Sequence, residues 1–189
     1  MKKTKGVQQF RERTSRLVIA ATFSLALFAG LGCHRILESL RGLHAYTWQS
    51  TSMEKTIYKG DTFLCDMNAY KTKAPVRGDV VVFEHKGTVL VKRLIGLPGD
   101  KVEGKNGVVS VNGVVLTETY AQHVDSPDAP ETFGPVTVAP GTVFLLGDNR
   151  NHSLDSRLDE FGEVKLSDIR GKAISIVSSV HGQSRQAIR

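Results

Sequence analysis

The hydrophobic positions of this chain fall into two different patterns. An unbroken apolar run extends from Leu17 to Cys33, with no ionisable group before Cys33. Beyond residue 45, apolar residues occur in short runs rich in Val, Ile, Phe and Thr, separated by Gly, Pro, Asp and Asn. Such runs are typical of strands, so we expect a mainly β domain over residues 45–182, built as an antiparallel β-sheet or in a β-barrel-like form. The expected strands are 62–66, 79–84, 88–95, 107–111, 114–117, 142–146 and 172–177.

Local sequence gives more detail in four of these places. Asn112-Gly113 lies between two Val-rich runs and is typical of a two-residue hairpin turn. The run from Asp79 to Phe83 shows no polar alternation, which predicts a strand covered on both faces. Residues 122–141 contain four of the six prolines and are expected to form an exposed connection or flap. Residues 183–189 are expected to form a flexible tail.

The long apolar run predicts a membrane anchor over residues 17–36. Seventeen helical residues at about 1.5 Å each reach about 25 Å, slightly less than a hydrocarbon core of about 30 Å. Ile36 can extend the apolar stripe. A cleavable signal peptide is an alternative, but no small-x-small site follows cleanly. Leu31-Gly32-Cys33 also hints at a lipoprotein cleavage site, although Gly30 stands where an aliphatic residue is usual.

The positive charge belongs to the N-terminus. Residues 1–16 hold six basic residues and one acid, a net charge of +5, whereas the whole chain has +6. This basic segment is expected to stay in the cytoplasm, which places residues 45–182 on the other side of a membrane crossed once. Because the rest of the chain is nearly neutral, the high isoelectric point does not predict nucleic-acid binding.

Cysteine and histidine spacing predicts no metal and no cofactor. Cys33 and Cys65 are far apart and form no Cys-x-x-Cys pair, and the six histidines show no paired ligand spacing. We expect Cys65 to be a small buried strand residue.

Ser52 and Lys92 are the candidate reactive residues. A serine hydroxyl is a poor nucleophile until a base removes its proton, and lysine can be that base only when uncharged. Lys92 lies in an alternating apolar segment, Val89-Leu90-Val91-Lys92-Arg93-Leu94-Ile95, where burial could lower its pKa. A Ser–His–Asp triad is disfavoured because no Gly-x-Ser-x-Gly sequence is present.

Four local sequences then point to one family. They are Ser52-Met53 followed by Thr56 and Gly60-Asp61, Arg77-Gly78-Asp79-Val80-Val81-Val82-Phe83, Val91-Lys92-Arg93 running into Gly96-Leu97-Pro98-Gly99-Asp100, and Leu146-Gly147-Asp148-Asn149-Arg150 continuing to Arg157. In order and spacing they resemble the bacterial type I signal peptidases, or leader peptidases. The resemblance implies a membrane-bound endopeptidase that removes signal peptides from exported preproteins, with those preproteins and membrane phospholipid as partners.

The resemblance also implies roles for individual residues. Ser52 matches the nucleophile and Lys92 the general base. Ser50 matches the hydroxyl that joins the Ser52 backbone N–H in the oxyanion hole, and Ser153 matches the residue that orients the lysine amine. Asp155 and Arg157 match a supporting ion pair. Tyr46, Trp48 and Val91 fall where the family forms shallow pockets for small substrate residues at positions −3 and −1.

The chain departs from the family pattern near Ser52. Gln49 and Lys55 replace prolines, and Thr51 replaces a glycine, which could reshape the turn that carries Ser52. Two other functions therefore stay open. One is the related Ser–Lys self-cleaving repressor class, which carries a DNA-binding domain where this chain has the apolar run. The other is a specialised or inactive membrane-tethered β domain, either a single-substrate pilin or conjugation-type peptidase or a binding module.

Overall fold

The computed structural model describes residues 42–122, 132–182 and 186–188. The expected basic segment 1–16 and anchor 17–36 lie outside these residues, as do residues 183–185 and 189 of the expected tail. Within the described part, no helix has both the length and the apolar character needed to cross a membrane.

The described chain is mainly β, as predicted, and every pair of named strands is antiparallel. The larger sheet has the order β1 (Leu43–Thr47), β2 (Thr62–Asp66), β11 (Ile169–Ser178), β3 (Val80–His85), β4 (Thr88–Gly96), β9 (Thr142–Leu146) and β10 (Val164–Lys165), and β12 (Gln186–Ala187) pairs with β11. A single 3₁₀ turn, η1 (Leu166–Asp168), precedes β11.

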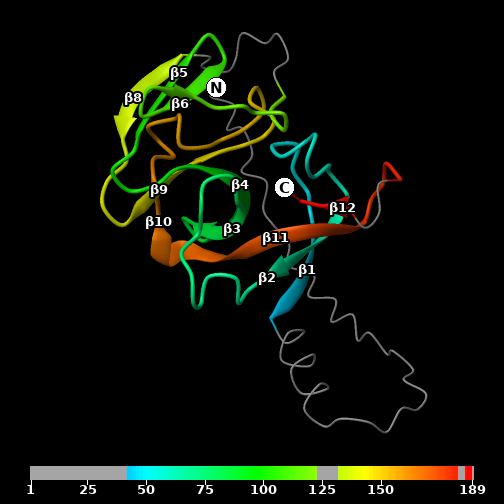
Figure 1. The fold of residues 1–189 in the computed structure, drawn as a ribbon. Helices are drawn as coiled ribbons and strands as arrows, with labels where there is room; N and C mark the ends of the chain where they lie inside the picture. Colours follow the sequence, from blue (N-terminus) through cyan, green and yellow to red (C-terminus); the bar gives the residue numbers. More distant parts are fainter. Residues whose placement is uncertain (1–41, 123–131, 183–185, 189) are drawn as a thin grey trace, which may run out of the picture.

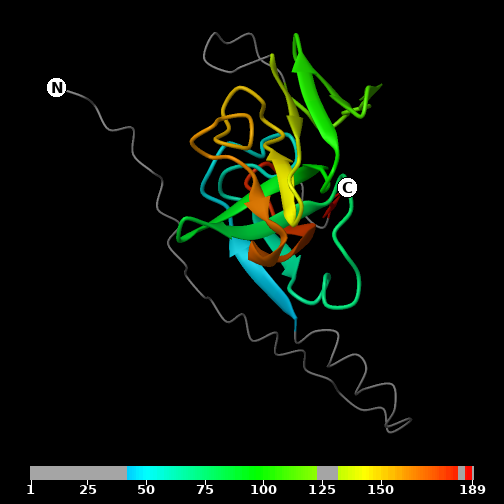
Figure 2. The ribbon, with the colours of Figure 1, turned by 90° about the vertical axis from the view of Figure 1, so that its left-hand side faces the viewer.

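A second sheet of four short strands lies above one end of the larger sheet in the views of Figures 1 and 2. Its order is β7 (Val114–Val115), β6 (Val108–Val111), β5 (Lys101–Lys105) and β8 (Phe133–Thr137). Part of the segment expected to be an exposed connection is therefore a strand, because β8 pairs with β5 along one edge.

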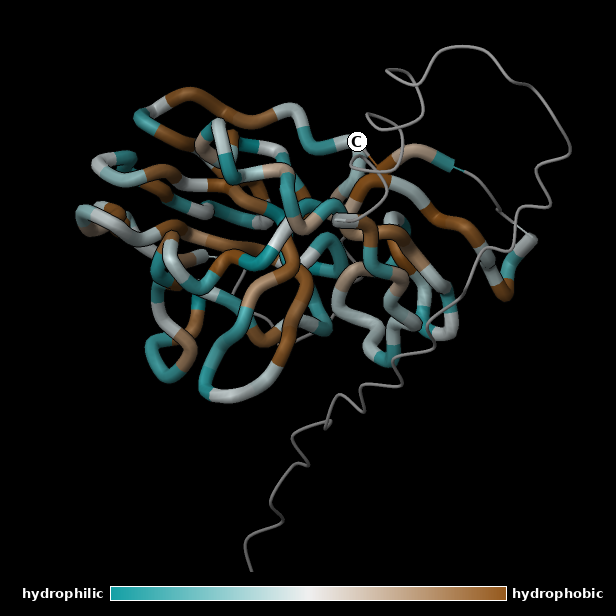
Figure 3. The backbone as a smooth tube through the Cα atoms, turned by 90° about the horizontal axis from the view of Figure 1, so that it is seen from below, coloured by the Kyte–Doolittle hydropathy of each residue, from teal (hydrophilic) through white to brown (hydrophobic). Residues whose placement is uncertain are grey.

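Three apolar clusters hold the sheets together, and β3 contributes to two of them. Val80 and Val82 belong to one cluster, whereas Val81 and Phe83 belong to another, and all four are at most 1% exposed. The predicted burial of this strand on both faces is thus confirmed. The third cluster contains Ile95 of β4, Phe144 of β9 and residues of the second sheet. Apolar stretches, brown in Figure 3, are short and separated by hydrophilic ones, as expected for strands and turns.

Candidate active site

Ser52 lies in a compact turn, residues 51–57, that follows β1. Backbone hydrogen bonds close this Ser52 turn, from Glu54 N–H to Thr51 O (3.1 Å) and from Ile57 N–H to Met53 O (2.8 Å). Met53 and Ile57 are fully buried in the same cluster as Val82, so the turn is anchored by packing on both sides. Ser52 itself is 4% exposed.

The structure brings Lys92 of β4 to this turn. Its Nζ donates a hydrogen bond to Ser52 Oγ over 2.7 Å, and the side chain is 2% exposed. Burial lowers the pKa of Lys92 from its ordinary value of 10.5 to about 8, against the opposing influence of the Asp155 and Asp148 carboxylates; Arg157 adds to the lowering. Because Lys92 lies at a buried strand position, its amine is less basic than usual, and it contacts the Ser52 hydroxyl directly.

Asp155 is fully buried and is neutralised by a close cation. It accepts hydrogen bonds from Arg157 Nε (2.8 Å) and Nη2 (3.0 Å) and from the Gly147 N–H (3.0 Å). Arg157 also donates to the Arg150 carbonyl over 2.6 Å. The carboxylate is thus satisfied within its own loop, residues 147–157.

Ser50 and Ser153 both lie close to the Ser52 backbone. The Ser52 N–H donates to Ser50 Oγ over 3.2 Å. Ser153 Oγ is buried and has no hydrogen-bond partner among the described residues, so the expected bond to the lysine amine is not formed in this structure. Its position beside Ser52 is nevertheless clear, because a Cβ placed on Gly147 would lie 2.2 Å from Ser153 Oγ and 2.6 Å from Ser52 O.

The three expected pocket residues belong to one apolar cluster. Trp48 and Val91 are each 2% exposed and share this cluster with Met53 of the Ser52 turn. Tyr46 is half-buried against the same cluster, and its ring stacks on Phe63 with centroids 5.7 Å apart. The Trp48 indole nitrogen is buried without a partner in the described part of the chain.

A buried ionic network next to the site was not predicted from the sequence. Arg93 donates through Nε (2.8 Å) and Nη2 (2.7 Å) to the two carboxylate oxygens of Asp148, with the side chains 1% and 0% exposed. Thr56 of the Ser52 turn donates to the same carboxylate. The Tyr120 ring covers the Arg93 guanidinium at 3.8 Å. The only sign of this network in the sequence was Arg93 itself, a second basic residue directly after Lys92 in an otherwise apolar run.

Comparison with known proteins identifies the family. A sequence profile described as signal peptidase, peptidase S26, matches residues 16–178. The chain belongs to the signal peptidase family S26. The resemblance drawn from its four local sequences is thereby confirmed, and the family is one of peptidases.

Individual relatives agree with this membership. The chain is 33% identical over 165 residues to a probable signal peptidase I-2 of Synechocystis sp., covering 83% of this chain and 71% of that protein. It is 30% identical over 171 residues to a signal peptidase I P of Bacillus subtilis subsp. natto, covering 86% and 88%. A crystal structure of a signal peptidase I from Enterococcus faecalis V583 matches 53% of this chain and 97% of that chain, with 36% identity and a TM-score of 0.45.

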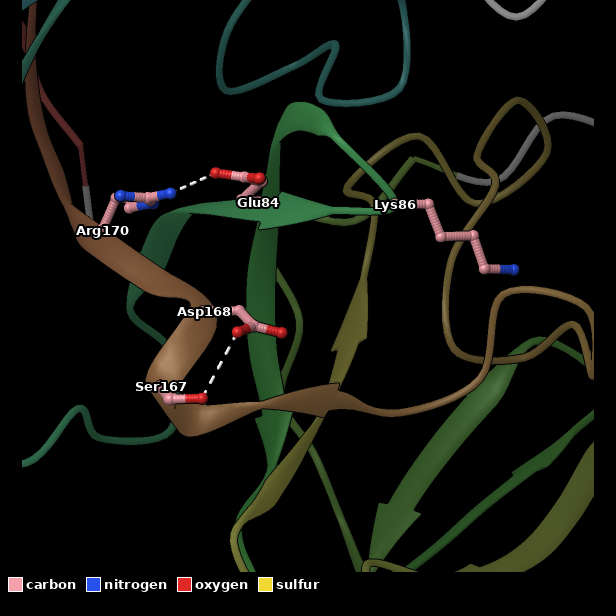
Figure 4. Close-up of a pocket in the computed structure, with 5 residues that line it drawn as sticks. All are labelled: Glu84, Lys86, Ser167, Asp168 and Arg170. Atoms are coloured by element: carbon pink, nitrogen blue, oxygen red, sulfur yellow. Dashed lines mark hydrogen bonds and ion pairs between the residues drawn. The ribbon is translucent and has the colours of Figure 1, made fainter.

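The described residues of this S26 family member form no group of three His, Cys, Asp or Glu side chains that could hold a metal ion. A polar groove of about 290 Å³ lies between the end of β3 and the segment of η1 and the start of β11, lined by Glu84, Lys86, Ser167, Asp168 and Arg170. Figure 4 shows Arg170 turned towards Glu84 and Ser167 towards Asp168, whereas Lys86 extends away from both pairs. Neither Ser52 nor Lys92 lines this groove, so it is separate from the Ser–Lys site.

Proposed function

We propose that this chain is a serine endopeptidase that removes N-terminal signal peptides from exported preproteins and cuts after small residues at −3 and −1. Ser52 is the nucleophile and Lys92 the general base, and the acyl group of the signal peptide is transferred to Ser52 Oγ as an acyl-enzyme while the mature protein leaves as the amine. The observation that carries the proposal is the 2.7 Å contact between Lys92 Nζ and Ser52 Oγ, together with the burial of the lysine. Membership of the S26 family supports it independently.

Burial of Lys92 makes the proton transfer feasible near neutral pH. A lysine with an ordinary pKa of about 10.4 is neutral in about one molecule in 2,500 at pH 7. With the pKa at about 8, the neutral fraction rises to about one in ten. The neutral amine accepts the Ser52 proton as the hydroxyl attacks, passes it to the departing amine, and then activates water to release the acyl group.

Ser50 and the Ser52 backbone supply the donors for the oxyanion. The Ser52 nitrogen and Ser50 Oγ are 3.2 Å apart, close enough for one oxygen to accept hydrogen bonds from both groups. Arg157 neutralises Asp155, which limits the tendency of that carboxylate to raise the pKa of Lys92. Ser153, buried beside Gly147, orients the lysine amine in the substrate-bound enzyme.

The substrate lies extended along a free strand edge. Residues 88–92 of β4 pair with β3, whereas the described pairing of β4 with β9 begins only at Arg93. The edge of β4 before Lys92 is therefore open to a substrate strand, which gains backbone hydrogen bonds with little sequence demand. Because Trp48 and Val91 are buried and Tyr46 packs against them, the pockets are shallow and admit small side chains.

We further propose that residues 17–36 anchor the catalytic domain at the outer face of a bacterial cytoplasmic membrane, close to phospholipid and to membrane-inserted signal peptides. The basic segment 1–16 stays in the cytoplasm. This topology brings the scissile bond and Ser52 to the same side of the bilayer.

Cleavage of a preprotein with Ala at −3 and −1, in detergent with phospholipid, tests the proposal. Wild type should cut after the −1 residue, and Ser52→Ala and Lys92→Ala should each lose at least a thousandfold in kcat while remaining folded by circular dichroism. Inertness of wild type on several such preproteins would instead indicate the specialised or inactive membrane-tethered β domain. Retained activity in Lys92→Ala would rule out this lysine as the base.

A further inference from the structure

One residue, Asn149, holds the backbone on both sides of Ser52. Its side-chain Nδ2 donates to the Thr51 carbonyl over 3.2 Å, and its backbone N–H donates to the Ser52 carbonyl over 3.1 Å. The same Nδ2 lies 3.4 Å from Glu54 Oε2. The Thr51 carbonyl also accepts the Glu54 N–H inside the turn, so both of its lone pairs are used.

The orientation of the Asn149 amide follows from its surroundings. Both groups within reach of the amide nitrogen are oxygen acceptors, the Thr51 carbonyl and the Glu54 carboxylate. A flipped amide would place Oδ1 against two oxygens, which is unfavourable. Oδ1 itself is buried without a partner among the described residues, so the contacts made by Nδ2 decide the rotamer.

These contacts fix the direction of the Ser52 N–H. The Thr51 carbonyl and the Ser52 N–H belong to one planar trans peptide unit and point in opposite directions. Holding the carbonyl from one side therefore aims the N–H to the other side. The backbone N–H of Asn149 fixes the following peptide unit in the same way, so the two torsion angles of Ser52 are both restrained.

Asn149 is itself held by a third segment of the chain. It is 2% exposed, and Gln122 pairs with it as an isolated parallel bridge. The Gln122 N–H donates to Asp148 O over 2.7 Å, and the Arg150 N–H donates to Gln122 O over 3.0 Å. Backbone hydrogen bonds on both sides of Asn149 thus fix its position, and its donating side chain is buried.

We propose that Asn149 is a positioning residue that aims the Ser52 N–H at the transition-state oxyanion, an inference that rests on the proposed function of Ser52. The contact acts on the oxyanion donor and leaves the Lys92–Ser52 hydrogen bond in place. Loss of this contact should therefore weaken binding of the tetrahedral state more than binding of the substrate or product.

The test compares Asn149→Ala and Asn149→Asp with wild type in the same preprotein assay. The aspartate keeps the shape of the side chain but cannot donate to the Thr51 carbonyl. Both variants should lose about 10- to 100-fold in kcat on the plateau of their pH profiles, with KM within threefold. The rising limb of the profile should be unmoved in Asn149→Ala, whereas the added carboxylate of Asn149→Asp can move it only to higher pH. Affinity for a peptide aldehyde, which forms a tetrahedral adduct with Ser52, should fall in parallel, while affinity for the product peptide stays within threefold. Glu54→Gln is the matched control, because it changes only the longer contact, and should keep kcat within threefold.

Each outcome decides between specific possibilities. If both Asn149 variants fold and keep wild-type kcat, or if they lose product and aldehyde affinity equally, the positioning role is wrong. If Asn149→Ala does not fold, the isosteric Asn149→Asp decides alone. Ser52→Ala and Lys92→Ala run alongside. Activity in those two would overturn the proposed function, whereas their inactivity combined with an active Asn149→Asp would overturn only this inference.

Discussion

At the scale of single residues, Lys92 is subject to opposed electrostatic influences. Burial disfavours its charged form, whereas the carboxylates of Asp155 and Asp148 favour it. Burial has the larger effect, and Arg157, which pairs with Asp155, adds to it, so the pKa falls to about 8. At neutral pH the folded protein therefore holds a lysine that is charged in most molecules and has little access to water, which is unfavourable for stability.

This burial predicts that Lys92→Met is more stable than wild type at pH 6.5, although it is inactive. A pKa lowered from 10.5 to about 8 corresponds to about 3 kcal/mol of lost stability below pH 8. Because the unfolded chain binds the extra proton between pH 8 and 10.5, wild-type stability recovers as the pH rises. The advantage of Lys92→Met in urea unfolding should thus shrink by about 2 kcal/mol between pH 6.5 and 9.5. A constant difference, or a less stable variant at both pH values, would contradict the buried-lysine account.

At the scale of elements, the Ser52 turn has its positive φ at Lys55 and not at Thr51. Thr51 stands where the family pattern has a glycine, a replacement that could reshape the turn, and its φ is not in the positive region. Lys55 takes a φ of +83° instead, a conformation that costs a non-glycine residue on the order of 1 kcal/mol. Its Nζ donates to the Ala121 carbonyl over 3.1 Å and so ties the turn to the segment that carries Tyr120.

Substitutions at Lys55 test this turn. Lys55→Gly should keep kcat within threefold and change the melting temperature little, because relief of the positive φ offsets the lost hydrogen bond. Lys55→Pro restores the residue type of the family pattern, yet proline is fixed near −65° and cannot adopt +83°. We expect it to lower kcat at least tenfold and to lower the melting temperature. Equal activity of the proline and glycine variants in the preprotein assay would show that the turn does not need this conformation.

Elements with strong apolar runs could be predicted from the sequence, and those without them could not. All seven expected strands are present, with ends within three residues of the observed ones. β1, β5, β8 and the two-residue strands β10 and β12 were missed. β5 reads Lys-Val-Glu-Gly-Lys, with Val102 as its sole apolar residue, and β8 contains Gly134 and Pro135. β5 and β8 form because they pair with strands of the second sheet, and their own composition does not indicate this pairing.

At the scale of the whole molecule, some residues of the candidate site could be predicted from the sequence and others could not. Ser52, Lys92 and the Asp155–Arg157 pair were found because each lies inside a distinctive local sequence, and the structure places them together. The contact of Asn149 with the Ser52 turn joins residues 98 positions apart, and the Tyr120 ring over Arg93 joins two separate segments. Such contacts depend on the tertiary fold, and no local pattern predicts them.

The pH dependence of kcat/KM for wild type on the preprotein tests the Ser52–Lys92 assignment most directly. The neutral amine is the active form, so kcat/KM should rise about tenfold per pH unit below an apparent pKa of about 8 and level off above it. A rising limb centred near 6.5, the ordinary pKa of histidine, would place the base elsewhere. A rate that still climbs at pH 10 would show that Lys92 is not buried in the working enzyme, and either result would contradict the account.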